Sequence, residues 1–124
     1  MRTFNNQVQT GIVLNAARVG TAIPLKNIYI FSIAAIIAGT PTGTIKLQVS
    51  NDPETNDSMP SANPQPTPTN WLDLANSSVS VTASGETMWS VKDVSYNWVR
   101  TSYADGSSGA STATLTTIVN AKGV

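Results

Sequence analysis

Apolar and polar residues alternate along most of this chain, in short segments separated by turn residues. In Thr44–Ser50, apolar side chains at positions 45, 47 and 49 alternate with polar ones, which is typical of a strand with one solvated face. Pro24 predicts that its short segment lies at a sheet edge. The sequence therefore predicts an all-β fold, a single antiparallel β-sandwich of the jelly-roll type with about eight strands. The segments with strand character are Val8–Leu14, Ala22–Leu25, Ile28–Ala38, Thr44–Ser50, Trp71–Leu74, Val79–Val81, Thr87–Val91, Trp98–Ala104 and Ala113–Ala121.

The most apolar segment, Ile28–Ala38, carries apolar side chains on both faces. Its β-branched and aromatic residues favour a strand buried on both sides, although periodicity alone also allows a short buried helix. Its 11 residues are too few for a membrane-spanning helix, which needs about 20. Gly39–Gly43 is a strong turn signal, so we expect Ile28–Ala38 and Thr44–Ser50 to form an antiparallel hairpin. Asp105–Gly109 predicts a hairpin-type turn before the last strand.

A proline-rich segment interrupts the alternation between residues 52 and 70. It contains five of the seven prolines in the chain: Pro53, Pro60, Pro64, Pro66 and Pro68. Because proline cannot donate a hydrogen bond to a sheet, the segment predicts a long loop with extended, solvated backbone. Such a loop is either a tolerated surface insertion or an element ordered against a partner subunit. We expect this loop and an N-terminal arm, Met1–Thr10, to be the contact elements of a single domain over residues 1–124.

Composition narrows the classes of function. Charged residues make up 11% of the chain, against about 25% in an ordinary soluble domain, and the net charge is zero. The basic residues are dispersed, so we predict no nucleic-acid partner. The chain has no Cys and no His, which excludes disulfides, the usual zinc sites and Ser-His or Cys-His nucleophiles. The N-terminus is polar where a signal peptide is apolar, and we predict no signal peptide and no membrane partner.

Three acidic residues at the start of the loop form the candidate metal site. Asp52, Glu54 and Asp57 would present oxygen ligands at short spacing, as calcium requires. Their spacing lacks the glycine and the distal glutamate of an EF-hand loop. The alternative is that these are solvated turn residues, with Asp52 accepting hydrogen bonds from backbone N–H groups. We predict no resident metal and no cofactor.

An acid–base enzyme would need two carboxylates that converge across the fold. Most carboxylates in this chain fall in turns, where Asp is common for backbone reasons. The sequence therefore predicts a protein that is not an enzyme and has no catalytic residue. The carboxylates that such an enzyme would have to use are Asp52, Glu54, Asp57, Asp73, Glu86, Asp93 and Asp105.

The three tryptophans and one arginine are the remaining candidates for a binding surface. We expect Trp71 and Trp89 in the core, because a Trp on a small sandwich buries a large apolar area. Trp98 is opposite in phase to Val99, so it either joins the core or forms a surface contact such as a sugar-stacking platform. Arg100 is either a buried guanidinium at an interface or an exposed one that stacks on Trp98.

Four motifs follow one another along the chain: Gly39-Thr-Pro-Thr-Gly-Thr-Ile-Lys-Leu-Gln-Val-Ser-Asn-Asp52, Asn70-Trp71, Met88-Trp89-Ser-Val91 and Tyr96-Asn-Trp-Val-Arg100. Together they resemble a family of small standalone bacteriophage proteins, over most of the chain after Gln9. The resemblance implies a virion β-sandwich, such as a capsid decoration, cement or spike subunit. The proline-rich insertion departs from the family pattern, which closes there by a short turn. The Ser-Asn-Asp strand end, the nearby Trp and the later Val-Arg strand are also faintly similar to discoidin-like sugar-binding sandwiches, from which no binding residue is carried over.

We therefore predict a structural protein of a bacteriophage virion that acts through protein–protein contacts. Its partners would be viral capsid or tail proteins and further copies of itself in a homo-oligomer, assembled in the host bacterial cytoplasm and located in the virion. The alternative function is a carbohydrate-binding module of a phage tail or cell-surface assembly, in which Trp98 or another exposed aromatic side chain stacks on a glycan. The predicted interface residues are Asp52, Pro53, Pro60, Pro64, Pro66, Pro68, Trp98 and Arg100.

Overall fold

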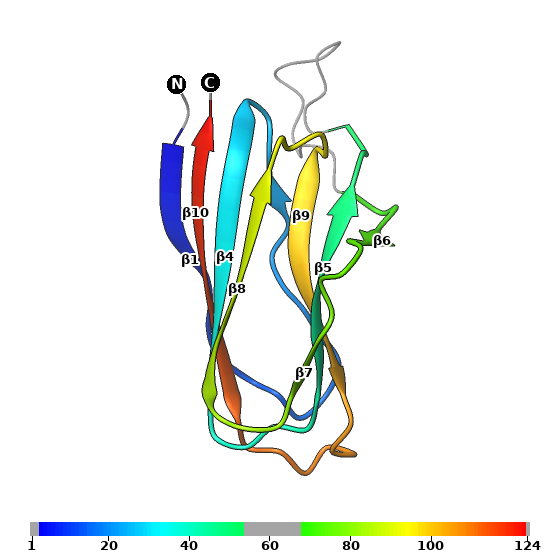
Figure 1. The fold of residues 1–124 in the computed structure, drawn as a ribbon. Coiled ribbons are helices and arrows are strands. Elements are labelled where there is room, and N and C mark those ends of the chain that lie inside the picture. The colour runs from blue at the N-terminus through cyan, green and yellow to red at the C-terminus, as the bar shows by residue number, and fades with distance from the viewer. Residues whose placement is uncertain (1–2, 54–67, 124) are drawn as a thin grey trace.

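The computed structural model describes residues 3–53 and 68–123, and within these ranges ten strands form two antiparallel sheets that pack face to face (Figure 1). One sheet, here the β4 sheet, has the strand order β1-β10-β4-β8. The other, here the β5 sheet, has the order β2-β9-β5-β6, with β3 also paired to β9 and β7 to β5. The predicted all-β sandwich is confirmed, and these ranges contain no helix that could cross a membrane. The strands are β1 (Thr3–Val13), β2 (Arg18–Val19), β3 (Ile23–Pro24), β4 (Ile28–Ala38), β5 (Gly43–Ser50), β6 (Leu72–Asp73), β7 (Val79–Val81), β8 (Gly85–Lys92), β9 (Trp98–Asp105) and β10 (Thr114–Gly123).

The core lies between the two sheets, because each long strand presents an apolar stripe on one face. Phe31, Ile33 and Ala35 of β4 are buried on the inner face of the β4 sheet. Ile45 and Leu47 of β5 are fully buried on the inner face of the β5 sheet, and the two stripes share the same hydrophobic clusters. Burying one such side chain contributes about 1.5–3 kcal/mol. The packing of the two sheets is therefore the main source of stability.

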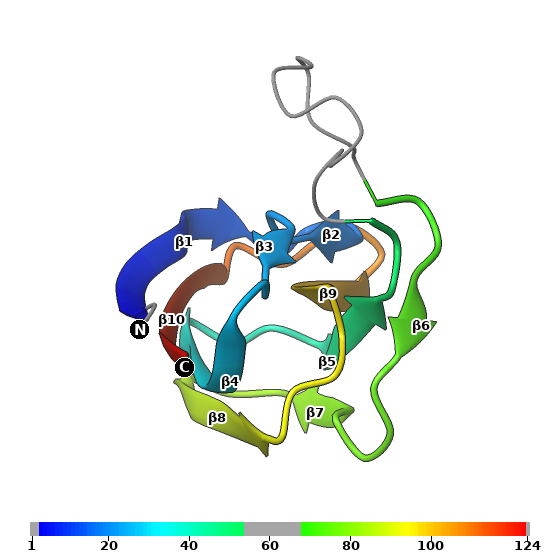
Figure 2. The same ribbon diagram turned by 90° about the horizontal axis from the view of Figure 1, so that it is seen from above.

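The predicted hairpins are wrong, because the connections concerned cross from one sheet to the other. β4 pairs with β10 and β8, whereas β5 pairs with β9, β7 and β6. The segment Gly39–Gly43 bridges the two sheets (Figure 2), and the side chain of Pro41 is buried within it. Asp105–Gly109 likewise leads from β9 in one sheet to β10 in the other. The crossing lets the apolar stripes of consecutive strands face each other across the core.

β4 confirms the strand predicted for Ile28–Ala38, but only one of its faces is buried. On its outer face, Ile36 is 38% exposed, and Met88 of the neighbouring β8 is 61% exposed. Ala34 lies between Met88 and Ile118 in the pairing register of the sheet. The prediction that Ile28–Ala38 is buried on both faces is therefore wrong for a single copy of the chain. The reason is that no element of the described chain covers the outer face of the β4 sheet.

The segment predicted as an N-terminal arm, Met1–Thr10, is part of an edge strand of the β4 sheet from residue 3 onward. β1 pairs with β10 along its length, with register shifts on both sides of Gln9. The side chain of Gln9 is buried, and its Oε1 accepts hydrogen bonds from Thr101 Oγ1 at 2.8 Å and Thr117 Oγ1 at 3.2 Å. Since Thr101 belongs to the β5 sheet and Thr117 to the β4 sheet, this polar group ties the two sheets together. The segment is ordered by the backbone of β10 and by this buried contact.

Gly43 lies where the connection between the sheets enters β5, and its backbone approaches β9 closely there. A Cβ atom at this position would meet the carbonyl oxygen of Ala104 and the phenol oxygen of Tyr103. We expect Gly43→Ala to lower the free energy of unfolding by about 1–3 kcal/mol, because a backbone carbonyl within a sheet cannot easily move aside. The exposed neighbour offers a control, Thr42→Ala, whose effect should stay within about 0.5 kcal/mol. Urea unfolding of both variants measures the difference, and equal stabilities would contradict the packing described here.

Candidate functional site at the base of the long loop

Asp52 holds the two ends of the long loop together. Its carboxylate accepts hydrogen bonds from the backbone N–H of Thr69 at 2.7 Å, from that of Asn70 at 2.9 Å and from Asn70 Nδ2 at 2.9 Å. The hydrogen bonds from Asn70, and then that from Thr69, hold the pKa of Asp52 below its usual value. The carboxylate is therefore charged at neutral pH. This arrangement, here the Asp52 clamp, confirms the alternative in which Asp52 satisfies backbone N–H groups.

The backbone of Asp52 fixes the connection that leads into β9. Its carbonyl oxygen accepts hydrogen bonds from Asn97 Nδ2 at 3.0 Å and from Trp98 Nε1 at 3.1 Å. Its N–H donates to Ser50 Oγ at 3.1 Å. Of the two alternatives for Trp98 the structure confirms the core, because its side chain is only 9% exposed and its indole N–H has an acceptor inside the fold. The side chain is thus not presented at the surface, where a sugar-stacking platform would need it.

Trp71 and Arg100 stack on the outside of the β5 sheet. The guanidinium carbon lies 4.2 Å from the Trp71 ring centroid, and Arg100 Nε donates to Gln48 Oε1 at 2.9 Å. Burial lowers the pKa of Arg100, but a guanidinium remains protonated at neutral pH. The predicted stacking of Arg100 is therefore present, with Trp71 in place of Trp98. Trp71 is half-buried rather than a core residue, whereas Trp89 packs against the core as predicted.

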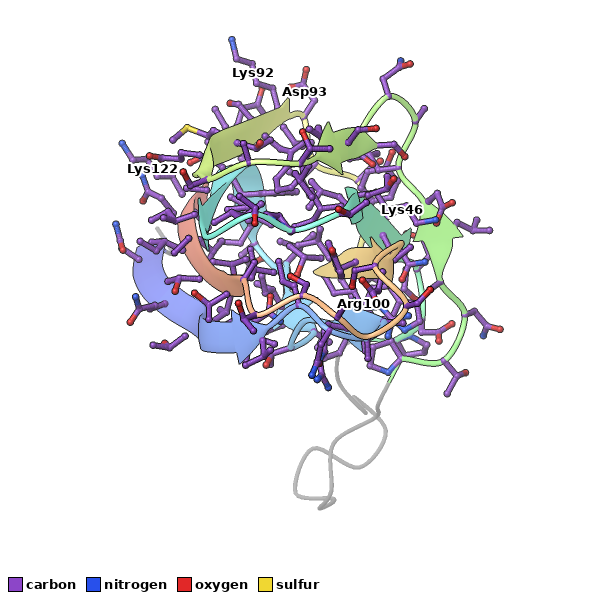
Figure 3. The ribbon with its side chains drawn as sticks, turned by 90° about the horizontal axis from the view of Figure 1, so that it is seen from below. Lys46, Lys92, Asp93, Arg100 and Lys122 are labelled. Carbon is purple, nitrogen blue, oxygen red and sulfur yellow. The ribbon has the colours of Figure 1, made fainter. Side chains whose placement is uncertain are left out.

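The hydrogen bonds that begin at Arg100 continue along the outside of the β5 sheet. Gln48 Nε2 donates to Asp73 Oδ1 at 3.1 Å, and Lys46 Nζ donates to Asp73 Oδ2 at 2.8 Å. Lys46 and then Gln48 hold the pKa of Asp73 below its usual value. Figure 3 shows Lys46 and Arg100 on this side of the molecule. The network orients Arg100 beneath Trp71, and its exposed ion pair adds little stability of its own.

A groove with a volume of about 530 Å³ opens beside the Asp52 clamp. Its walls combine the aromatic rings of Trp71 and Tyr96 with the polar side chains of Asp52 and Asn70. Leu72, which also lines the groove, is 74% exposed. Aromatic and apolar surface beside a few fixed polar groups is typical of binding sites. The groove is lined by Val49, Ser50, Asn51, Asp52, Thr69, Asn70, Trp71, Leu72 and Tyr96.

The calcium candidates do not form a site within the described residues. Glu54 and Asp57 lie outside these residues, and both carboxylate oxygens of Asp52 accept hydrogen bonds from N–H groups. In the described ranges no group of three or more acidic side chains could hold a metal ion. Among the predicted interface prolines, Pro53 is exposed and Pro68 is buried. The remaining interface prolines, Pro60, Pro64 and Pro66, also lie outside the described residues.

The other described carboxylates occupy separate places in the fold. Asp105 organises its turn by accepting hydrogen bonds from Ser107 Oγ at 2.6 Å and from the N–H groups of Ser107 at 2.9 Å and Gly109 at 3.1 Å, which together lower its pKa. Asp93 interacts with the Tyr29 hydroxyl and raises the pKa of that phenol. Glu86 is exposed on β8. The positions of these carboxylates do not test whether the protein is an enzyme, and its lack of catalytic activity stays a prediction.

Sequence reasoning did not single out Tyr96, Asn70 or Leu72 as site residues. Asn70 and Tyr96 lie in the motifs that carry the phage-protein resemblance, but nothing in those motifs indicates that the two residues line one groove. Tyr96 precedes β9 and Asn70 precedes β6, and the two strands pair with different edges of β5. Knowledge of that strand order would have been needed to bring them together.

Comparisons with known proteins bear on the fold. No protein-family model matches the sequence, and a search of curated proteins finds no match. The crystal structure of the SPBc2 prophage-derived protein YomS is similar, with a TM-score of 0.55 and 11% identity over 97% of this chain and 92% of that chain. The Tobacco streak virus coat protein gives a TM-score of 0.47 with 10% identity, over 99% of this chain and 87% of that chain. The first likeness shows a shared fold, and the second is too distant to carry an argument.

We expect Asp52→Asn to loosen both ends of the loop. An amide offers one acceptor oxygen in place of two, so its NH₂ group would face either the two backbone N–H donors or the Nδ2 of Asn70, and the charge that strengthens these hydrogen bonds is lost. Hydrogen exchange at these two backbone amides should become faster, while exchange at Ile33 in the core of β4 should not change. Exchange at Thr69 and Asn70 equal to that of the wild type would contradict the clamp.

The Asp52 clamp should also depend on pH. Because the folded-state pKa of Asp52 is lowered, its contribution to stability is full above the ordinary value of about 3.9 and is lost as pH falls through the lowered value. The difference in thermal unfolding midpoint between the wild type and Asp52→Asn should be largest at neutral pH and shrink below about pH 4. A difference that stays constant on acidification would contradict a charged carboxylate in the clamp.

Proposed function

We propose that this protein is a structural protein of a bacteriophage virion, and that it acts through protein–protein contacts at the groove beside the Asp52 clamp. The observation that carries the proposal is the presentation of Trp71, Tyr96 and Leu72 on a surface that the clamp holds in place. Trp, Tyr and Arg dominate the energetic hot spots of protein interfaces. A surface that is already ordered loses less conformational entropy on binding.

The more specific role that we propose is that of a capsid decoration, cement or spike subunit, located on the virion and assembled with copies of itself and with capsid or tail proteins. The low charged content of 11% suits polar, water-bridged contacts with symmetric neighbours. The sequence resemblance to small phage proteins supports this role. A prophage-derived protein with the same fold is compatible with it.

Leu72→Ser tests the groove as the contact surface. The Leu72 side chain is 74% exposed, so the substitution should leave the fold intact. We expect the variant to be incorporated into particles at least about fivefold less than the wild type, because an apolar contact at the edge of a hot spot is lost. Val19→Ser is the matched control, since Val19 is 57% exposed on β2 outside the groove.

The measurement is quantitative mass spectrometry of gradient-purified phage particles from cells that express each variant. Equal incorporation of Leu72→Ser and Val19→Ser would overturn the assignment of the contact to the groove. Absence of the wild-type chain from purified particles would overturn the virion function itself.

A second candidate function is carbohydrate binding at the same groove. The observation that favours it is the placement of two aromatic rings, Trp71 and Tyr96, beside the polar side chains of Asp52 and Asn70. Aromatic faces bind the apolar faces of sugars, while fixed polar groups bind their hydroxyls. On a glycan array, Trp71→Ala should abolish any binding seen for the wild type, whereas Val19→Ser should retain it. A wild type that binds no glycan would remove this alternative.

A further inference from the structure

The outer face of the β4 sheet combines apolar and polar rows at its centre with charges at both ends, and its polar central row is Asn120, Ser32 and Ser90. In its apolar central row, Ala34 lies between Ile118 and Met88. Met88 is 61% exposed and Ile36, in the adjacent row, is 38% exposed. No segment of the described chain covers this face. Apart from Ser32, the side chains of β4 are nevertheless apolar on this side as well as on the core side, which is typical of a strand buried on both faces.

Two other rows on this face carry opposite charges, Glu86 in one and Lys92 with Lys122 in the other. Glu86 and Lys92 are six residues apart along β8, and an isoleucine of β4 lies at the centre of each row. Figure 3 shows Lys92 and Lys122 pointing away from the molecule on the side of the β4 sheet. Among the described residues, the charged groups of these rows have no ion-pair partner. The acidic row is Thr116, Ile36 and Glu86, and the basic row is Lys122, Ile30 and Lys92.

We propose that this face binds the same face of a second copy of the chain, about a two-fold axis that crosses the strands at the level of Ile33 and Trp89. The inference rests on the proposed function, since it names one of the protein–protein contacts through which the chain would assemble. With the strands of the two copies antiparallel, β8 lies over the partner's β8. Glu86 then faces the partner's Lys92, and Ile36 faces the partner's Ile30. The symmetry repeats each contact, so the face is complementary to itself.

The charge pattern selects this orientation over the alternative. If the two copies packed with parallel strands, the basic row of one would face the basic row of the other, and like charges would repel. The antiparallel arrangement instead places both acidic rows against basic rows. The charges therefore determine the orientation of the copies, while the paired isoleucines, Ile36 and Ile30, and the exposed Met88 supply the apolar area removed from water.

The size of the face is sufficient for a specific dimer. Four strands about 4.8 Å apart and the four rows from Ile30 to Ile36, about 6.8 Å apart, give a contact on the order of 500 Å² per copy, or about 1,000 Å² in total. This is close to the minimum area of about 1,000 Å² for a specific protein–protein interface. We therefore expect a dimer that forms at micromolar concentrations.

Charge exchange across the face tests the proposal by analytical ultracentrifugation of the full chain. We expect Glu86→Lys and Lys92→Glu each to raise the dissociation constant at least about tenfold, because symmetry introduces each repulsion twice. An equimolar mixture of the two variants should associate again, since the mixed pair restores an opposite charge at both contacts. Ala17→Lys changes the charge in the connection between β1 and β2, outside this face, and should associate like the wild type.

A wild type that stays monomeric up to about 1 mM would overturn the proposal. Single variants that associate like the wild type, or a mixture that remains monomeric while both variants show wild-type circular dichroism, would also overturn it. Incorporation into phage particles is measured separately, so the two proposals can fail independently. A chain that is present in particles but does not self-associate through this face would keep the virion function and remove this interface.

Discussion

The packing of β4 against β5 across the core is the constraint on which the rest of the fold depends. Each strand has an apolar stripe that must leave water, and neither sheet can bury its stripe without the other. Phe31 and Ile33 share one cluster with Leu47, and Ala35 shares another with Ile45. Because β4 faces β5 across the core, the chain crosses between the sheets at residues 39–43, and five other connections of the described chain, among them residues 93–97 and 105–113, cross as well. These crossings set the strand order and bring the start of β9 beside the end of β5.

The strands could be predicted from the sequence, but their partners could not. Alternation within Thr44–Ser50 depends on neighbours along the chain, so it is visible locally, and β5 has nearly these bounds. A turn signal such as Gly39–Gly43 indicates that the chain reverses, but it does not say whether the next strand joins the same sheet. The hairpin predictions failed at that point. The same limit hid the partner of Arg100, because β9 pairs with one edge of β5 and Trp71 returns at the other.

Asp52 is a candidate calcium ligand by sequence, and in the structure it organises the backbone at the base of the long loop. Its position after β5 and before a proline-rich segment suggested either a calcium ligand or a turn residue. In the structure its carboxylate accepts hydrogen bonds from the backbone N–H groups of Thr69 and Asn70, and its carbonyl accepts them from the side chains of Asn97 and Trp98. One side chain and one peptide group thus join the start of the loop, its return and the entry to β9. The groove lies at this junction, which explains why its polar groups are fixed.

The outer faces of the two sheets differ in how their charges are satisfied. On the β5 sheet, Lys46, Gln48, Asp73 and Arg100 form one connected network within the chain. On the β4 sheet, Glu86 has no ion-pair partner among the described residues. A face whose charges are satisfied internally supports the site beside it, whereas a face with unpaired charges suits contact with another molecule. The two faces are therefore the two separate surfaces that we propose for assembly.

A density map of the assembled phage particle tests the central claim most directly, because it shows the neighbours of every surface at once. The account predicts that the chain occupies the particle and that a capsid or tail protein contacts the groove beside Trp71 and Leu72. A particle in which the chain is present but the groove faces solvent in every copy would contradict the claim that this site makes the contact. A particle without the chain would contradict the claim of a virion protein.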